Sequence, residues 1–179
     1  RMTQPPRIAF YAPLKPPDHP RPSGDRQMAR MLFAALRRAG YDVQLASRYV
    51  AYSKRPDAAL MHERRAGALL EAQRLLRDWE ASGLRPDLWF CYHPYDKAPD
   101  WLGVAVCDAL GIPMVTAEPG RTHQEPAAAW APWRDEAQRG LAMAALLLVM
   151  NDEDEAYLLS FVPGERLLLF VPFLDLDEL

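Results

Sequence analysis

The stretches RIAFYAP at residues 7–13 and PSGDRQM at residues 22–28 decide the fold of this sequence. The first is a short apolar run that ends at a proline, which is typical of a buried strand. The second opens a helical pattern, because Met28, Met31, Leu32 and Leu36 recur at helical spacing before Gly40. The chain therefore starts with a strand, a loop and a helix.

The connection Ser23-Gly24-Asp25 between this strand and helix allows two interpretations. Ser23 or Asp25 can cap the helix, which would make the stretch only a turn. Alternatively, Gly24 leaves backbone N–H groups bare at a helix start, where a phosphate or a sugar can approach closely. These residues by themselves leave both interpretations open.

The alternation of strand and helix patterns continues along the chain. Short apolar runs predict strands at residues 42–47, 87–93, 112–117, 145–150 and 166–171. Helical spacing and end signals predict helices at residues 25–39, 56–82, 99–111 and 127–142, and another from 152. We expect Pro99 in the first turn of its helix and Asn151 as the cap of the last one. The inner face of the long helix is expected to carry Leu69, Ala72, Leu75, Leu76 and Trp79.

Such alternation predicts an α/β domain, with a Rossmann-like, doubly wound, mostly parallel sheet and helices on both faces. The 179 residues suffice for one domain with a core, and 50% of them are apolar. Ligands of these sheets bind outside the carboxyl ends of the strands. The loops at that edge are therefore the candidate binding elements.

Composition narrows the class of protein. The formal charge is −3, whereas nucleic-acid-binding proteins usually carry a basic excess. The two cysteines, Cys91 and Cys107, lie in apolar segments, as expected for buried thiols in a reducing compartment. The longest apolar run, residues 141–150, is too short to span a bilayer. The sequence therefore predicts a soluble, cytoplasmic protein that does not bind nucleic acid.

Several catalytic motifs are absent from the sequence. It contains no G-x-G-x-x-G, G-x-x-x-x-G-K-[ST] or G-x-S-x-G. This argues against NAD or FAD bound in the usual mode, a P-loop NTPase and a nucleophile elbow. The histidines and cysteines lack metal-ligand spacing. The acidic run at residues 152–155 suits the positive end of a helix dipole, so no metal site is predicted.

Polar side chains follow three of the predicted strands. The candidate binding residues are Ser23, Gly24 and Asp25 after the first strand, His93 and Lys97 after the third, and Glu118, Arg121 and His123 after the fourth. Glu118 or His123 can act as a general acid or base, and Arg121 can hold a phosphate. We expect the three loops to meet at one edge of the sheet, with solvated or packed loops as the alternative.

Arginines recur on two predicted helices, as Arg30, Arg37 and Arg38 on the first and Arg64, Arg65, Arg74 and Arg77 on the second. One interpretation is a peripheral membrane contact through anionic lipid heads. The favoured alternative is a solvated helix face on which arginines alternate with acids.

Four stretches together resemble the N-terminal domain of bacterial GT-B-fold glycosyltransferases. They are APLKPPDHPRPSGDRQMARML at residues 12–32, YDKAPDWLG at 95–103, GIPMVTAEPG at 111–120 and VPFLD at 171–175. The family is the large retaining one called glycosyl transferases group 1, of the family 4 type. The resemblance covers nearly the whole chain and depends on the order and spacing of the four stretches.

This resemblance implies an enzyme of two Rossmann-like domains that face each other across a cleft. Residues 1–179 would be the single N-terminal, acceptor-side domain. The C-terminal domain, which would hold the nucleotide-diphosphate-sugar donor, is absent from this chain, so the piece alone is expected to be inactive. The family needs no metal, because basic residues and helix dipoles neutralise the leaving diphosphate.

The resemblance also assigns roles to residues. Glu118 matches a polar position beside the transferred sugar and is the predicted catalytic residue. Ser23, Gly24 and Asp25 match a glycine loop near the donor phosphates. This chain has one glycine where many relatives have two, and Pro119-Gly120 where closer relatives have Ala-Ser.

The sequence therefore predicts the acceptor-binding domain of a retaining, nucleotide-sugar-dependent glycosyltransferase of the hexosyltransferase type. Its partners would be a nucleotide-sugar donor and a sugar or lipid-linked acceptor, and it would need no other cofactor. Two alternatives stay open: half of another GT-B-fold enzyme, such as a sugar-nucleotide epimerase, and a self-standing Rossmann-like binding module. The donor sugar, the acceptor and the oligomeric state are not specified by the sequence.

Overall fold

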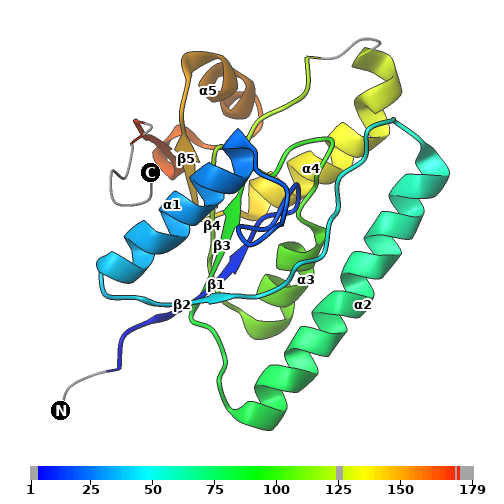
Figure 1. The fold of residues 1–179 in the computed structure, drawn as a ribbon. Coiled ribbons are helices and arrows are strands. Elements are labelled where there is room, and N and C mark those ends of the chain that lie inside the picture. The colour runs from blue at the N-terminus through cyan, green and yellow to red at the C-terminus, as the bar shows by residue number, and fades with distance from the viewer. Residues whose placement is uncertain (1–3, 124–126, 172, 174–179) are drawn as a thin grey trace.

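A computed structural model describes residues 4–123, 127–171 and 173 of the protein. Its centre is a six-stranded sheet in the order β2-β1-β3-β4-β5-β6, and all neighbouring strands are parallel (Figure 1). The strands are β1 Arg7–Tyr11, β2 Asp42–Leu45, β3 Leu88–Tyr92, β4 Met114–Ala117, β5 Leu146–Val149 and β6 Leu167–Leu169. Each lies within its predicted range, which confirms the predicted α/β class.

Helices connect the strands in the predicted order. They are α1 Gly24–Arg38, α2 Ala58–Ser82, α3 Trp101–Leu110, α4 Ala131–Met143 and α5 Asp152–Leu159, with short 3₁₀ helices η1 Ala127–Trp130 and η2 Gly164–Arg166. The helix predicted at residues 127–142 thus begins with a 3₁₀ turn before α4. The predicted VPFLD stretch at residues 171–175 lies mostly outside the described residues, as do Gln124 and Glu125 of the loop after β4.

Short polar side chains fix where the helices start. Ser23, Asp57, Asp100 and Asn151 are the N-caps of α1, α2, α3 and α5, and each accepts a hydrogen bond from a backbone N–H of the first turn. The predicted cap at Asn151 is therefore confirmed. The prediction that Pro99 lies in the first turn of α3 is wrong, because the Asp100 cap starts the helix only at Trp101.

The two faces of the sheet pack against different helices. Figure 1 shows α1 on one side of the sheet and α2, α3 and α4 on the other. On the α1 side, Phe10 and Phe90 stack at 5.4 Å and pack with Leu32. On the opposite side, Tyr11 and Trp89 pack with residues of α2 to α4. This is the predicted doubly wound arrangement.

The inner face of α2 differs in part from its prediction. Ala72 and Leu75 are buried as expected, together with Ala68, but Leu69 is 40% exposed. Expecting Leu69 inside was wrong, because the helix contacts the rest of the protein through a stripe of residues that includes Ala68 rather than Leu69.

A buried polar cluster lies where β3 meets the start of α3. Trp89 is fully buried, and its indole Nε1 donates to Asp100 Oδ2 at 2.8 Å, while the Gly103 N–H donates to Asp100 Oδ1 at 2.7 Å. A methyl group at position 103 would overlap the Trp89 indole and the Asp100 carboxylate. Burial raises the pKa of Asp100, and these hydrogen bonds oppose the rise. The cluster thus needs a residue without a side chain at position 103.

Both cysteines are buried free thiols, as predicted. Burial raises the pKa of Cys107 to about 12 and that of Cys91 well above its usual range. Neither thiol is therefore primed as a nucleophile.

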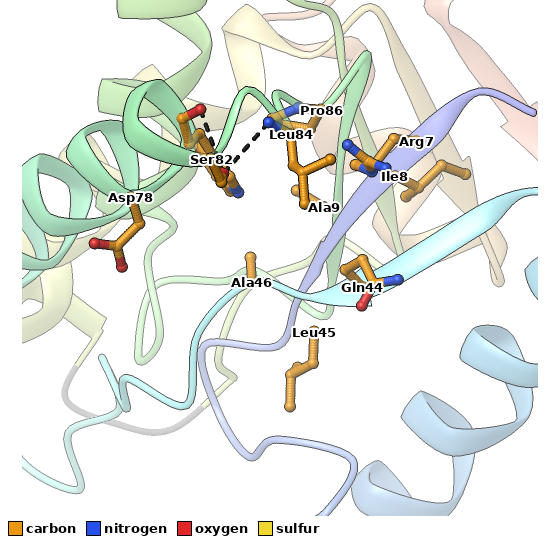
Figure 2. Close-up of a pocket in the computed structure, with 11 residues that line it drawn as sticks. Arg7, Ile8, Ala9, Gln44, Leu45, Ala46, Asp78, Ser82, Leu84 and Pro86 are labelled. Atoms are coloured by element: carbon orange, nitrogen blue, oxygen red, sulfur yellow. Dashed lines mark hydrogen bonds between the residues drawn. The ribbon is translucent and has the colours of Figure 1, made fainter. Parts of the chain in front are cut away.

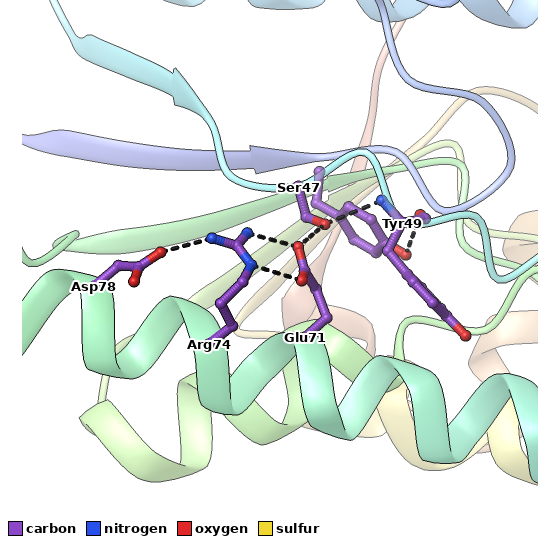
Figure 3. Close-up of polar contacts among 6 residues, drawn as sticks. Ser47, Tyr49, Glu71, Arg74 and Asp78 are labelled. Atoms are coloured by element: carbon purple, nitrogen blue, oxygen red, sulfur yellow. Dashed lines mark hydrogen bonds and ion pairs between the residues drawn. The ribbon is translucent and has the colours of Figure 1, made fainter.

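A polar network ties the segment after β2 to α2 (Figure 3). The Ser47 hydroxyl donates to Glu71 Oε1 at 2.6 Å, and the same hydroxyl accepts from the Tyr49 N–H at 3.0 Å. Arg74 donates to both Glu71 oxygens at 2.8 Å and to Asp78 Oδ2 at 2.6 Å. The segment continues to the carboxyl edge of the sheet, where the Ser53 N–H donates to the Lys97 carbonyl at 2.8 Å. The network therefore fixes the segment between β2 and α2, which reaches the loop after β3 at Lys97.

Replacing Glu71 by Gln is expected to lower the free energy of unfolding by about 1 kcal/mol near neutral pH, since Arg74 is half exposed and solvent screens the pair. The hydrogen bond from Arg74 is the largest cause that lowers the pKa of Glu71 in the folded protein. This stabilisation is present above the unfolded pKa and is lost as the pH falls through the folded pKa. Urea unfolding at neutral and acid pH measures the difference. Glu80→Gln, an exposed change on the same helix, is the matched control, and equal effects of the two changes would contradict the network's role.

Candidate functional site

The carboxyl ends of β1, β3 and β4 and the start of α1 form one edge of the sheet, which we call the rim. The strand order reverses direction between β1 and β3, because the chain moves outward from β1 to β2 and then returns to the other side. Open α/β sheets bind their ligands at such a switch point. Among the predicted site residues, Ser23, His93 and Glu118 follow these three strands.

Ser23 is the N-cap of α1, as the first of the two interpretations of the PSGDRQM stretch predicts. Its Oγ accepts from the Arg26 N–H at 3.2 Å and from Lys15 Nζ at 2.9 Å. Gly24 is exposed, and a methyl group placed there would meet no atom within 4 Å. The cap interpretation is confirmed. Close approach of a ligand to Gly24 stays a prediction that the open space favours.

His93 and Glu118 both adopt the left-handed backbone conformation, with φ of 56° and 54°. They are the only non-glycine residues with positive φ in the described part of the chain. The His93 N–H donates to the Ala117 carbonyl at 2.8 Å, and His93 Nδ1 lies 2.9 Å from the Glu118 carbonyl oxygen. A carbonyl only accepts, so this bond places a proton on Nδ1 and leaves Nε2 to face other partners. Strained residues of this kind cluster at functional sites.

Tyr92 orients the Glu118 carboxylate. Its hydroxyl donates to Glu118 Oε2 at 2.8 Å, and the Glu118 N–H donates to the Leu148 carbonyl at 2.9 Å. Burial raises the pKa of Tyr92, and the neighbouring charges of Glu118 and Asp25 add to the rise. The hydroxyl therefore stays protonated and holds one oxygen of Glu118, leaving the other for a ligand.

Removing the Tyr92 hydroxyl tests this positioning role. Tyr92→Phe is expected to lower the rate of any reaction that uses the Glu118 carboxylate by about tenfold, because the carboxylate loses a charge-assisted hydrogen bond. The acid limb of the pH–rate profile should shift as well, which loss of packing would not cause. Tyr41→Phe, at an exposed tyrosine, is the control. Turnover and pH profile equal to those of the wild type would contradict the role of Tyr92.

Asp96 joins the loops that follow β3 and β4. Its side chain is fully buried, Oδ1 accepts from the Thr122 N–H at 2.7 Å, and Oδ2 lies 3.5 Å from Arg134 Nη2. Burial raises the pKa of Asp96, and the Thr122 N–H and Arg134 oppose this. Asp96 thus holds the segment that carries Arg121 and His123. The sequence pattern did not single out this residue.

The other predicted site residues have separate neighbours. Lys97 Nζ lies 5.1 Å from the Trp130 ring centroid, and the Arg121 guanidinium lies 5.2 Å from that of Tyr157. His123 Nδ1 lies 3.5 Å from Glu153 Oε1. The structure therefore brings together Glu118 and His93, whereas Arg121 and His123 contact side chains of α5.

A separate hollow of about 430 Å³ lies between β1, β2 and the end of α2 (Figure 2). Its charged lining residues already have partners, since Arg7 pairs with Asp42 at 2.8 Å and Asp78 pairs with Arg74. None of the predicted site residues lines it. The hollow is therefore not part of the rim.

Two further searches cover the described residues only. In that part of the chain no group of three or more His, Cys, Asp or Glu side chains is arranged to hold a metal ion. None of the described helices combines the length and apolar character that crossing a bilayer requires.

Comparisons with known proteins show a shared fold. No protein-family model matches this sequence, and no curated protein is similar to it. The co-structure of S. aureus MnaA with UDP aligns over 92% of this chain and 43% of that chain, with a TM-score of 0.56 and 11% identity.

Two UDP-GlcNAc 2-epimerases also share the fold. The enzyme from Methanocaldococcus jannaschii aligns over 91% of this chain and 45% of its own, with a TM-score of 0.57 and 11% identity. The one from Rickettsia bellii aligns over 90% and 43%, with a TM-score of 0.59 and 10% identity. The chain thus spans less than half the length of these proteins and matches one half of a GT-B-like fold.

Proposed function

We propose that this chain is one half of a nucleotide-sugar enzyme with a GT-B-like fold, and that the enzyme is a sugar-nucleotide epimerase. The main observation behind this proposal is the hydrogen-bonded pair Glu118–Tyr92 at the switch point of the sheet. Glu118 and the nearby His93 both have a left-handed backbone conformation. The fold shared with proteins named for UDP-GlcNAc 2-epimerisation or solved with UDP supports a UDP-sugar as substrate.

The chemistry of epimerisation fits the side chains of the rim. Where a carbon that bears hydrogen is inverted by proton transfer, one group takes a proton and another delivers one to the opposite face. Glu118 and His93 are an acid–base pair of this kind, held by strained turns on adjacent strands. The open start of α1 at Gly24 offers backbone donors and a partial positive charge for the diphosphate. A second Rossmann-like domain would close the site.

A retaining glycosyltransferase is the second candidate. The resemblance of residues 12–32 and 111–120 to glycosyl transferases group 1 favours it. In that enzyme Glu118 would lie beside the transferred sugar, with Lys97, Arg121 and His123 toward the acceptor. The two candidates differ in one requirement, because a transferase needs an acceptor and an epimerase does not.

The experiment uses the complete gene product that contains this chain. It is incubated with UDP-GlcNAc, with and without candidate acceptors, and the sugar is followed by proton NMR. A C2 epimer or released UDP without an acceptor supports the epimerase. Sugar transfer that depends on an acceptor supports the second candidate. Failure of any UDP-sugar to bind or react would contradict both.

A further inference from the structure

The flank of α1 that faces β2 carries a cavity to whose lining four arginines contribute. The cavity has a volume of about 540 Å³, and Arg30, Arg37 and Arg38 of α1 line it together with Arg48, which follows β2. Asp18 is the one acid among the described residues that line it. Four arginines and one aspartate are thus among its lining residues.

Two of these guanidinium groups have contacts within the protein. Arg48 Nε donates to Asp18 Oδ2 at 2.6 Å, and the Arg37 guanidinium lies 6.0 Å from the Phe33 ring centroid. Contact with a ring face uses none of the five N–H donors of an arginine, and the bond to Asp18 uses only part of the Arg48 fork. Both side chains therefore keep N–H donors with which the oxygens of a phosphate can bond.

The floor of the cavity is apolar. Phe33, Ala34 and Leu45 line it beside the arginines. A ligand that only carried charge would gain nothing from this surface, whereas a planar or aliphatic group would bury area against it. The lining therefore matches a ligand with an anionic and an apolar part.

The arginines of α2 are arranged differently. Arg74 is paired with Glu71 and Asp78 on its own helix, and Arg65 Nε lies 3.5 Å from Glu136 Oε2. The interpretation as a face on which arginines alternate with acids describes α2. Arg30, Arg37 and Arg38 of α1 line one cavity.

The cavity is separate from the rim. Leu45 of the edge strand β2 lines the cavity, whereas Tyr92 is the last residue of β3 and Glu118 follows β4. We propose that this arginine cavity binds a phosphate ester or diphosphate joined to a planar or aliphatic group. The phosphate oxygens accept from Arg37 and Arg48, and the attached group lies over Phe33 and Leu45. The proposal does not depend on the function proposed for the rim.

Calorimetric titration of the protein with inorganic pyrophosphate and with phenyl phosphate tests the proposal. We expect both to bind, and Arg37→Gln with Arg48→Gln to weaken binding by about tenfold or more through the loss of charge-assisted bonds. Arg37→Lys with Arg48→Lys keeps the charge, and is expected to weaken binding less. Arg77→Gln removes one charge from exposed α2 and should leave the affinity unchanged.

A second experiment with lipid vesicles distinguishes a lipid headgroup from a free phosphorylated molecule. Sedimentation with phosphatidylcholine vesicles, with and without phosphatidylglycerol, measures binding to lipid headgroups. Binding to phosphatidylglycerol that depends on Arg37 and Arg48 identifies a headgroup, and binding to the soluble phosphates alone identifies a free phosphorylated molecule. The proposal is overturned if neither probe binds, or if Arg77→Gln weakens binding as much as the paired change.

Discussion

In the UDP-sugar enzyme that we propose, Glu118→Gln is expected to lower turnover by about 100-fold or more, the usual contribution of a general acid or base. Glutamine keeps the size of the side chain and still accepts from the Tyr92 hydroxyl, so the structure of the rim is retained. What is lost is the carboxylate that we propose to take or return the proton. Initial rates over a range of pH, with UDP-GlcNAc as substrate, measure the change.

The matched control for this prediction is Glu165→Gln, which neutralises an exposed carboxylate in η2. It should leave the rate within about twofold, as surface changes usually do. A rate for Glu118→Gln within a few-fold of the wild type would remove Glu118 from the chemistry. Such a result would also leave the strained turn at the end of β4 without a catalytic explanation.

Gly103→Ala is expected to destabilise the protein by about 3 kcal/mol, the upper range for overpacking a core. The added methyl group meets the fully buried Trp89 indole and the Asp100 carboxylate that caps α3. Neither partner can move without giving up the hydrogen bond between Trp89 and Asp100. Urea unfolding followed by tryptophan fluorescence measures the loss.

Gly24→Ala is the matched control for Gly103→Ala. Both glycines lie in the first turns of helices, but a methyl group at position 24 meets no atom within 4 Å. This change should therefore leave the free energy of unfolding within about 1 kcal/mol of the wild type. Equal stability of the two variants would show that the core around Trp89 relaxes at little cost.

Most of the fold could be predicted from the sequence, for a physical reason. Strands buried on both faces are short apolar runs, and prolines, glycines and capping residues interrupt them regularly here, as Pro13, Gly40 and Gly111 do. The errors lie at helix boundaries and helix faces. Pro99 was misplaced because the Asp100 cap starts α3 only at Trp101. Leu69 was misplaced because α2 buries Ala68 instead.

The site could be predicted only in part. The sequence places His93 and Glu118 after neighbouring strands, because parallel strands deliver their carboxyl ends to one edge. It gives no sign of the left-handed turns, since neither position carries a glycine. Tyr92 and Asp96 depend on how the two loops fold against each other, and no spacing along the chain encodes such contacts.

The left-handed turns at His93 and Glu118 have a consequence for protein engineering. Glycine adopts that conformation freely, so a search for stabilising substitutions would favour it at both positions, with a gain of about 1 kcal/mol at each. The same substitutions would delete an imidazole and a carboxylate. Thermal stability and the proposed catalysis therefore place opposite demands on these two positions. Variants selected only for heat tolerance would tend to lose the two side chains that we propose for catalysis.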